Sequence, residues 1–216
     1  QSRSSAASDV YKRQQLFWFD ILGKRLLSQQ DGQPLEWRLN ERASAAGWID
    51  RDRLLMASET ALSVFDLRSG ALEQVCALEA NNPLTRSNDG RADPWGGFWI
   101  GTMGLQAQPQ AGAIYRYYRG ELRRLFGDLS ITNAICFAPD RRFAYFADTA
   151  RQQIWRQPLD ELHGWPSGEP QPFIDGRVAG LNPDGAVIDS QGRLWNAQWG
   201  ACLLYTSDAA DDLLCV

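Results

Sequence analysis

A phrase that recurs four times constrains the fold of this chain more than any other feature. Each copy has an aspartate, a polar or glycine-containing turn of two or three residues, and then a run of aromatic and aliphatic residues. The copies begin at Asp50, Asp93, Asp140 and Asp189, so their spacings are 43, 47 and 49 residues. Repeats of about 40 to 50 residues that contain short strands are typical of a β-propeller, in which each repeat is one four-stranded blade.

The segments between these phrases agree with that interpretation. Three of them read "ALSVFDLRSGALEQV", "GAIYRYYRGELRRLF" and "QQIWRQPLDELHGW". They alternate apolar and polar positions, as half-buried antiparallel strands do, and long amphipathic helices are absent. Residues 16–29 resemble the tail of one more unit. We therefore predict an all-β fold with about four blades, some of them incomplete; a sandwich of evenly spaced hairpins is the alternative, although a sandwich need not repeat one phrase.

The two ends of the sequence differ from the middle. Residues 4–14 read "SSAASDVYKRQ" and residues 202–212 read "CLLYTSDAADD". When the first is reverse-translated and read on the complementary strand, with the frame shifted by one, the second appears. This relation is typical of a nucleotide adaptor. We therefore predict that residues 1–14 and 202–216 are translated adaptor sequence, and that residues 15–201 form an incomplete β-propeller domain.

Charge and composition exclude several classes of function. The net charge is -4 and the chain has no basic cluster, which argues against nucleic acid as a partner. No apolar run approaches the roughly 18 to 20 residues of a membrane helix, so no membrane partner is expected. The chain has a single histidine, which argues against a His-ligated zinc site and against a Ser-His-Asp triad. We expect a cytoplasmic protein with a small-molecule partner, and nothing here implies a protein partner.

Polar residues stand out at three related positions. Five, seven and five residues before the repeated aspartate of their unit lie Asn88, Asn133 and Asp184. Each is interpreted as part of a turn next to a strand that lines the central channel. Their similar offsets would bring the side chains to one end of that channel, where oxygen ligands suit a hard cation such as Ca²⁺ or Mg²⁺. Taken singly, each residue could serve only to form its turn.

Several motifs carry a resemblance to a known family. "NDGRADPWGGFWIGTMG", "ITNAICFAPDRRFAYFADT" and "NPDGAVIDSQGRLWNAQWG", together with "LFWFDI", resemble the senescence marker protein/gluconolactonase family, also called the regucalcin-like family. The likeness covers nearly all of residues 15–201. It implies a six-bladed propeller that hydrolyses sugar lactones with one divalent metal ion, Ca²⁺, Zn²⁺, Mn²⁺ or Mg²⁺, at the mouth of the channel.

The resemblance also implies roles for individual residues. Asn133 and Asp184 would be metal ligands, and Asp184 would also be the catalytic acid/base. Arg86 and Asn88 would hold the substrate. The family's remaining ligand is a glutamate before "LFWFDI", where this chain has the predicted adaptor. A substrate-binding glutamate of some members has only Gln106 near its place, and Gln106 receives no role.

Two other functions stay open at this point. A propeller phosphotriesterase or aryl-ester hydrolase could share a metal-centred channel, and a propeller could instead bind metal or protein without catalysis. The chain as it stands is expected to be inactive, because it lacks one predicted metal ligand and about a third of the ring. Unpaired strand edges at its first and last blades would also favour aggregation.

Overall fold

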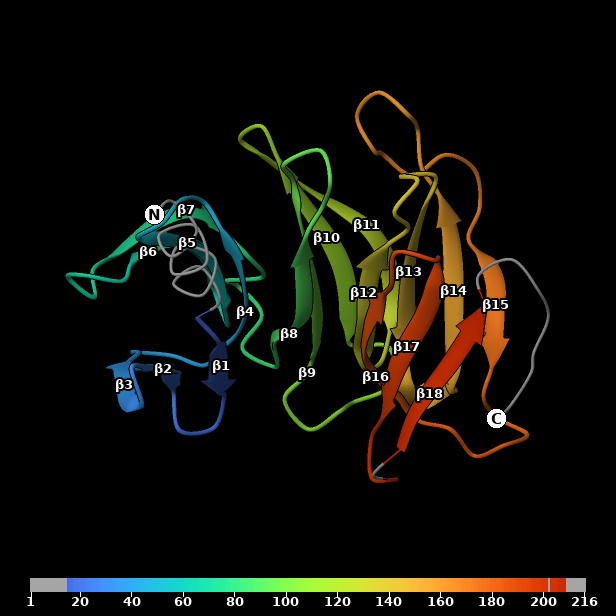
Figure 1. Ribbon diagram of the computed structural model, residues 1–216, viewed down its shortest axis with the longest axis horizontal. Coiled ribbons are helices and arrows are strands. Elements are labelled where there is room, and N and C mark those ends of the chain that lie inside the picture. Colours follow the sequence, from blue (N-terminus) through green and yellow to red (C-terminus); the bar gives the residue numbers. More distant parts are fainter. Residues whose placement is uncertain (1–14, 202, 209–216) are drawn as a thin grey trace, which may run out of the picture.

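The computed structural model describes residues 15–201 and 203–208 (Figure 1). Almost all regular structure in this part is β-strand, and the short 3₁₀-helix η1 (Thr149–Arg151) is the exception. The predicted all-β class is therefore confirmed. Within the same residues, no helix has the length and apolar character needed to cross a membrane.

In the described residues, five antiparallel sheets follow one another, and the strands within each sheet pair in sequence order. Three sheets have four strands: β4 (Ala43–Trp48), β5 (Arg53–Ser58), β6 (Ala61–Asp66) and β7 (Leu72–Ala77); β8 (Thr85–Ala92), β9 (Phe98–Gly104), β10 (Gly112–Tyr118) and β11 (Glu121–Leu129); β12 (Thr132–Phe137), β13 (Phe143–Asp148), β14 (Gln153–Pro158) and β15 (Gln171–Asp175). Two sheets have three strands: β1 (Phe17–Asp20), β2 (Arg25–Gln30) and β3 (Gln33–Arg38); β16 (Pro183–Ile188), β17 (Arg193–Gln198) and β18 (Leu203–Asp208).

The number of blades agrees in part with the prediction. The expected count was about four, whereas the structure has three complete four-stranded sheets and two with three strands. The first three-stranded sheet contains residues 16–29, as predicted. Strand β18 comes from the segment predicted to lie outside the domain, yet it pairs with β17 along its whole length. The adaptor origin of the two ends stays a prediction, and residues 1–14, 202 and 209–216 lie outside the described part.

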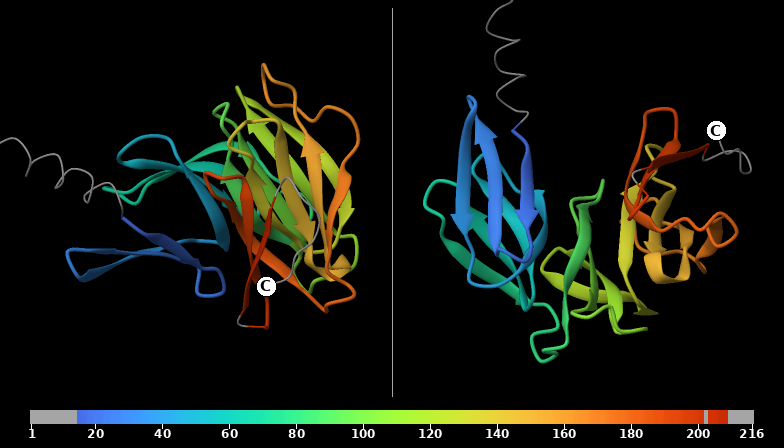
Figure 2. Two further views of the ribbon diagram at one scale, coloured as in Figure 1. Left: turned by 45° about the vertical axis from the view of Figure 1, so that its right-hand side comes forward. Right: turned by 90° about the horizontal axis from the view of Figure 1, so that it is seen from below.

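The sheets are arranged around an arc, as a propeller requires (Figure 2). Seen from below, the blue sheet β1–β3 lies at one end of the arc and the orange and red sheet β16–β18 lies at the other. The first strands of successive sheets pack against one another in the order β4, β8, β12 and β16. These four strands form the inner side of the arc, so a residue on one of them can reach the next blade.

Apolar side chains fill the space between successive sheets. Four clusters of buried residues lie at the four boundaries, one cluster to each pair of neighbouring sheets. Trp99 shows how they pack: its ring is fully buried and meets Phe137 edge to face at 5.5 Å between ring centroids. Burying apolar area contributes about 25 cal/mol per Å², so these boundaries hold the blades together.

The repeated aspartates close the turn between the first and second strands of their sheets. In all four, Oδ1 accepts a hydrogen bond from the backbone N–H two residues later, with N···O distances of 2.9 to 3.1 Å: Asp50, Asp93, Asp140 and Asp189. A short carboxylate that bonds its own turn is a common way to stabilise a reversal of the chain. The phrase that reveals the repeat is therefore a structural signal.

One of these turns predicts a pH dependence of stability. Asp189 Oδ2 accepts hydrogen bonds from Trp195 Nε1 at 3.0 Å and from Arg193 Nε at 2.8 Å. These bonds hold the pKa of Asp189 well below its usual range. A lowered folded-state pKa stabilises the protein above the unfolded-state pKa, and this contribution is lost as the pH falls toward the folded value. Below about pH 4, urea unfolding should show a smaller loss of stability in Asp189→Asn than in the wild type.

A matched control separates this effect from a general acid response. Asp31 is exposed in the turn between β2 and β3, and no residue in the described part donates a hydrogen bond to its carboxylate. Asp31→Asn should follow the wild-type curve. Parallel curves for the wild type and Asp189→Asn would contradict the prediction.

Candidate functional site

The residues singled out in the sequence lie on the inner strands of three neighbouring sheets. Arg86 and Asn88 are in β8, Asn133 is in β12 and Asp184 is in β16. They were predicted in turns before these strands, and that placement is wrong. The pairing of each inner strand with the next strand shifts register at or beside Asn88, Asn133 and Asp184. Such β-bulges re-aim side chains, which gives three inner strands a common irregularity at the predicted positions.

Asn88 connects the first two of these strands. Its Nδ2 donates to Asn133 Oδ1 at 3.2 Å and to the backbone carbonyl of Thr132 at 2.8 Å. Arg86 Nη1 in turn donates to Asn88 Oδ1 at 2.9 Å and to the carbonyl of Ser87 at 2.8 Å. Arg86, Asn88 and Asn133 therefore form one hydrogen-bonded row across β8 and β12.

A threonine that the sequence reasoning missed extends this row toward β16. Asn133 Nδ2 donates to Thr149 Oγ1 at 2.9 Å, and this hydroxyl donates to the carbonyl of Pro183 at 2.6 Å. Pro183 directly precedes Asp184, so Thr149 links the strands that carry the two predicted metal ligands. Thr149 follows the strand of "FAYFADT", and its sequence position gives no sign that it meets a residue 34 positions later.

The carboxylate of Asp184 is free to bind a ligand. Asp184 is half-buried, and no residue in the described ranges 15–201 and 203–208 donates a hydrogen bond to its carboxylate oxygens. Its backbone carbonyl accepts from Asn196 Nδ2 at 3.0 Å. The lone pairs of these oxygens are therefore available to a cation or to a hydrogen-bond donor of a ligand.

A second carboxylate, that of Asp89, lies near Asp184. Burial raises the pKa of Asp89 above its usual range, and the negative charge of Asp184 adds to the rise. The backbone N–H of Ile135, 2.7 Å from Asp89 Oδ2, and the charge of Arg91 oppose it. Two acidic groups, Asp89 and Asp184, therefore lie near each other on the inner strands, with the charge of Arg91 beside them.

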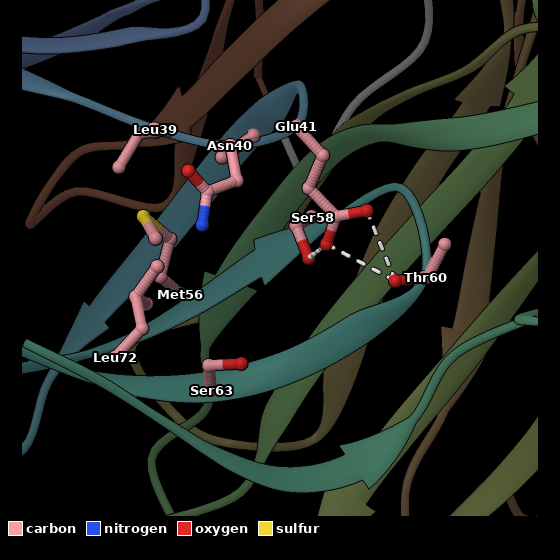
Figure 3. A pocket seen from close by; sticks show the side chains of 9 residues that line it. Leu39, Asn40, Glu41, Met56, Ser58, Thr60, Ser63 and Leu72 are labelled. Carbon is pink, nitrogen blue, oxygen red and sulfur yellow. Dashed lines mark hydrogen bonds between the residues drawn. The ribbon is translucent and has the colours of Figure 1, made fainter.

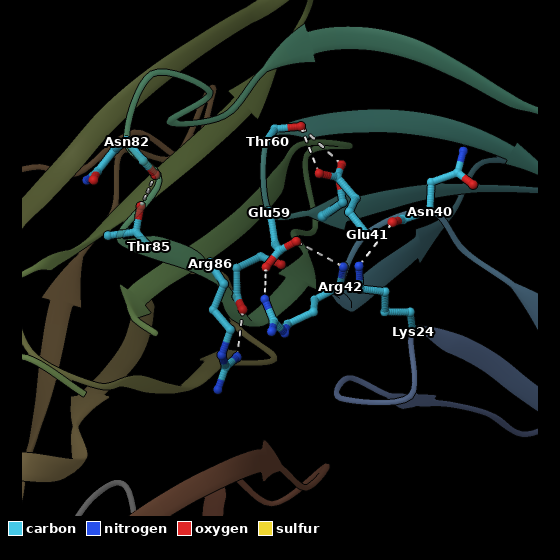
Figure 4. A network of polar contacts seen from close by, with 11 residues as sticks. Lys24, Asn40, Glu41, Arg42, Glu59, Thr60, Asn82, Thr85 and Arg86 are labelled. Atoms are coloured by element: carbon cyan, nitrogen blue, oxygen red, sulfur yellow. Dashed lines mark hydrogen bonds and ion pairs between the residues drawn. The ribbon is translucent and has the colours of Figure 1, made fainter. Parts of the chain in front are cut away.

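Arg86 is the cationic member of the site. Its guanidinium donates to Asn88 Oδ1 and the Ser87 carbonyl, and no described carboxylate pairs with it. Burial lowers the pKa of Arg86, and the neighbouring Arg42, which forms an ion pair with Glu59, adds to this effect. Figure 4 shows Arg86 beside that pair. A half-buried guanidinium bonded to neutral acceptors alone can still bind oxygen atoms of a substrate.

A cavity of about 290 Å³ lies apart from these residues (Figure 3). Its lining comes from the β3–β4 connection and the second sheet: Leu39, Asn40, Glu41, Ala43, Met56, Ser58, Thr60, Ser63 and Leu72. Glu41 accepts hydrogen bonds from Ser58 Oγ and Thr60 Oγ1, so its carboxylate already has partners. Arg86, Asn88, Asn133 and Asp184 do not line this cavity.

The donor atoms of the site suit a hard divalent cation. Among the residues that the structure describes, no three His, Cys, Asp or Glu side chains gather closely enough to hold a metal ion. Asn133 and Asp184 supply an amide oxygen and a free carboxylate, which favour Ca²⁺, Mg²⁺ or Mn²⁺ over the nitrogen- and sulfur-seeking Zn²⁺. Two such residues require further ligands from water, substrate or another residue. Residues 1–14, where the family's glutamate was expected, contain no glutamate.

The chain has relatives among curated proteins. It is 41% identical over 187 residues to a Rhizobium meliloti (strain 1021) protein that is provisionally named a sugar lactone lactonase, covering 86% of this chain and 63% of that protein. It is 38% identical over 192 residues to L-arabinolactonase of Azospirillum brasilense, covering 86% and 63%. The chain thus spans just under two-thirds of the length of these relatives.

Solved structures and a family-wide comparison agree with these relatives. A calcium-binding protein, regucalcin, from Agrobacterium tumefaciens str. C58 superposes with a TM-score of 0.89 at 38% identity, covering 92% of this chain and 68% of that one. This similarity confirms the propeller-type fold. Residues 6–214 match the SMP-30/Gluconolactonase/LRE-like region. The chain therefore belongs to the SMP-30/gluconolactonase/LRE-like family.

Proposed function

We propose that this chain carries the metal- and substrate-binding residues of a sugar lactone hydrolase that depends on a divalent cation. The observation that carries the proposal is the row Arg86, Asn88 and Asn133, which leads across the inner strands toward the free carboxylate of Asp184. The names of the relatives, two of them lactonases and one a calcium-binding protein, support the same reaction class and cofactor class.

Asn133 Oδ1 and the Asp184 carboxylate would hold the cation. When bound, a divalent cation polarises the lactone carbonyl and stabilises the negative charge that develops on its oxygen. Thr149 and Asn88 would orient the Asn133 amide for this task, because Thr149 accepts from its nitrogen and Asn88 donates to its oxygen. Fixed neighbours of this kind commonly set the direction of a ligand's donor atom.

Asp184 would also move the proton in hydrolysis. The oxygen of a water molecule bonds to the lactone carbonyl carbon while the Asp184 carboxylate accepts a proton from that water. The bond between the carbonyl carbon and the ring oxygen then breaks, and Asp184 returns the proton to the ring oxygen, which leaves an open-chain hydroxy acid. A carboxylate without a hydrogen-bond donor in the described structure has lone pairs available for this role.

Arg86 and Asn88 would orient the sugar. Arg86 presents a planar set of N–H donors that can bind adjacent hydroxyl or carboxylate oxygens in a fixed direction. Asn88 lies between Arg86 and Asn133, so a substrate held by Arg86 would lie next to the proposed cation site. Holding the lactone there would orient its carbonyl carbon toward the attacking water, and such orientation lowers the entropic part of the barrier.

Metal removal tests the proposal. A full-length protein that carries this segment is dialysed against EDTA and assayed with five- and six-carbon sugar lactones, before and after Ca²⁺, Mn²⁺, Mg²⁺ or Zn²⁺ is added back. The metal-free protein should lose about 100-fold or more in kcat/KM, because a Lewis acid contributes several kcal/mol to such reactions. Added metal should restore the rate.

Parallel assays distinguish the other enzyme classes. Aryl esters and phosphotriesters should be hydrolysed far more slowly than sugar lactones. Undiminished lactone hydrolysis by the EDTA-treated protein would overturn the metal-dependent mechanism. Metal binding without hydrolysis of any of these substrates would instead favour a propeller that only binds.

A further inference from the structure

Arg91 of β8 reaches the two neighbouring sheets with one guanidinium group. Its Nε donates to the backbone carbonyl of Ile135 in β12 at 2.9 Å, and its Nη2 donates to the carbonyl of Ala186 in β16 at 2.9 Å. Asp89, also in β8, accepts a hydrogen bond from the N–H of Ile135 at 2.7 Å. The two side chains therefore occupy both backbone polar groups of Ile135, and one of them also binds the next strand.

These contacts involve residues that closely follow the proposed metal ligands in the sequence. Ile135 lies two residues after Asn133, and Ala186 lies two residues after Asp184. Both residues lie at or beside a register shift, on a strand that forms one edge of its sheet, and an edge strand leaves backbone groups available to a side chain from another sheet. Because the guanidinium of Arg91 is rigid and bonds both carbonyls, it fixes the distance between the two bulges.

The bulge in β12 also needs external support. Ala134, between Asn133 and Ile135, has a φ of 58°, in the left-handed region that alanine rarely adopts. Such a conformation persists where the surroundings over-determine it, and it is frequent at functional sites. Asp89, which accepts from the N–H of Ile135, and Arg91, which donates to its carbonyl, supply that support on the residue that follows Ala134.

We propose that Arg91, assisted by Asp89, is a positioning residue that sets the separation of Asn133 and Asp184 for cation binding. The inference rests on the proposed function, because the proposed function makes Asn133 and Asp184 metal ligands. Arg91 acts through the backbone of two strands and does not itself contact the cation. Its loss should therefore weaken metal binding without removing a ligand.

The test measures binding of metal alone to the full-length protein. Ca²⁺ is titrated by calorimetry, and Mn²⁺ by electron paramagnetic resonance, for the wild type, Arg91→Met and Arg91→Lys. Arg91→Met should raise the Kd about 10-fold or more, as loss of supporting residues around metal ligands commonly does. The spectrum of bound Mn²⁺ should also change, because the ligand geometry is altered. Arg91→Lys, which keeps a cationic donor, should recover part of the affinity.

A matched variant removes the effect of stability alone. Arg193→Met deletes an arginine from the hairpin that carries Asp184, but the guanidinium of Arg193 bonds Asp189 at the outer turn. Urea unfolding of all variants reports any loss of stability. Arg193→Met should keep the wild-type Kd and Mn²⁺ spectrum even where its stability is lowered.

The outcomes separate the two proposals. A wild-type protein that binds neither cation would overturn the proposed metal site and this inference together. Wild-type binding with a Kd of Arg91→Met within about twofold of the wild type and an unchanged Mn²⁺ spectrum would overturn the positioning role alone. If Arg91→Met does not fold, the same threshold is applied to Arg91→Gln, which also removes the cationic donor.

Discussion

Replacing Asp184 by alanine in the full-length protein should lower kcat/KM for sugar lactones by at least about 10³-fold, since general acid/base catalysis alone contributes 10²- to 10⁴-fold. The expected loss is large because one carboxylate is assigned two roles, cation ligand and proton carrier. Its oxygens receive no hydrogen bond from the described residues, so no other structural function accounts for them. The measurement is steady-state hydrolysis with saturating metal.

Asp184→Asn separates the two roles. The amide keeps an oxygen that can bind a cation but cannot accept a proton at neutral pH, so part of the metal affinity should remain while hydrolysis is lost. Asp189→Asn, five residues along the same hairpin, removes a carboxylate that bonds Arg193 and Trp195 away from the site, and should keep near-wild-type activity. Substantial hydrolysis by Asp184→Ala would show that this residue is not the acid/base.

Replacing Asp93 by alanine should lower the free energy of unfolding by about 3 to 5 kcal/mol, because it leaves a buried charge without its partner. Arg116 is fully buried, and its Nε donates to Asp93 Oδ2 at 2.7 Å. Neither Nη atom has a hydrogen-bond partner in the described structure. The guanidinium lies over the rings of Tyr118 and Trp165, 4.4 and 4.5 Å from their centroids, which compensates it in part.

Asp140→Ala is the matched control for Asp93→Ala. Both aspartates occupy the same place in the repeat and close the same kind of turn. Asp140, however, pairs with the exposed Arg142, and an exposed pair contributes about 1 kcal/mol or less. The difference between the two variants in urea unfolding therefore measures the buried ion pair. Equal losses would mean that turn closure, and not the buried charge, accounts for the cost.

The fold could be predicted because its signals are local. A carboxylate that bonds a backbone N–H two residues later leaves a recognisable phrase in the sequence, and strand alternation follows from the two faces of a sheet. The blade count was less accurate. Strands β1–β3 lack the phrase that marks the other sheets, and β18 lies in a segment that was assigned to the adaptor.

The sequence predicted the residue types of the candidate site, but the predicted local structure was wrong. Asn, Asp and Gly are frequent in turns, so the polar positions were expected there. Pairing with the neighbouring strand instead places Asn88, Asn133 and Asp184 at bulges, and pairing is a property of two segments. The contacts of Thr149 and Arg91 join residues 16 to 95 positions apart, and no local pattern predicts them.

The sequence alone determined the class of fold, the repeat and the chemical types at the candidate site, because each depends on residues within one hairpin. Only the tertiary structure decided which side chains meet. Asn88 bonds Asn133 because the inner strands of adjacent blades pack together, and for the same reason the guanidinium of Arg91 reaches backbone carbonyls of two other inner strands. Hydrogen bonds between blades depend on how the sheets are arranged in space, and that arrangement is a property of the whole chain.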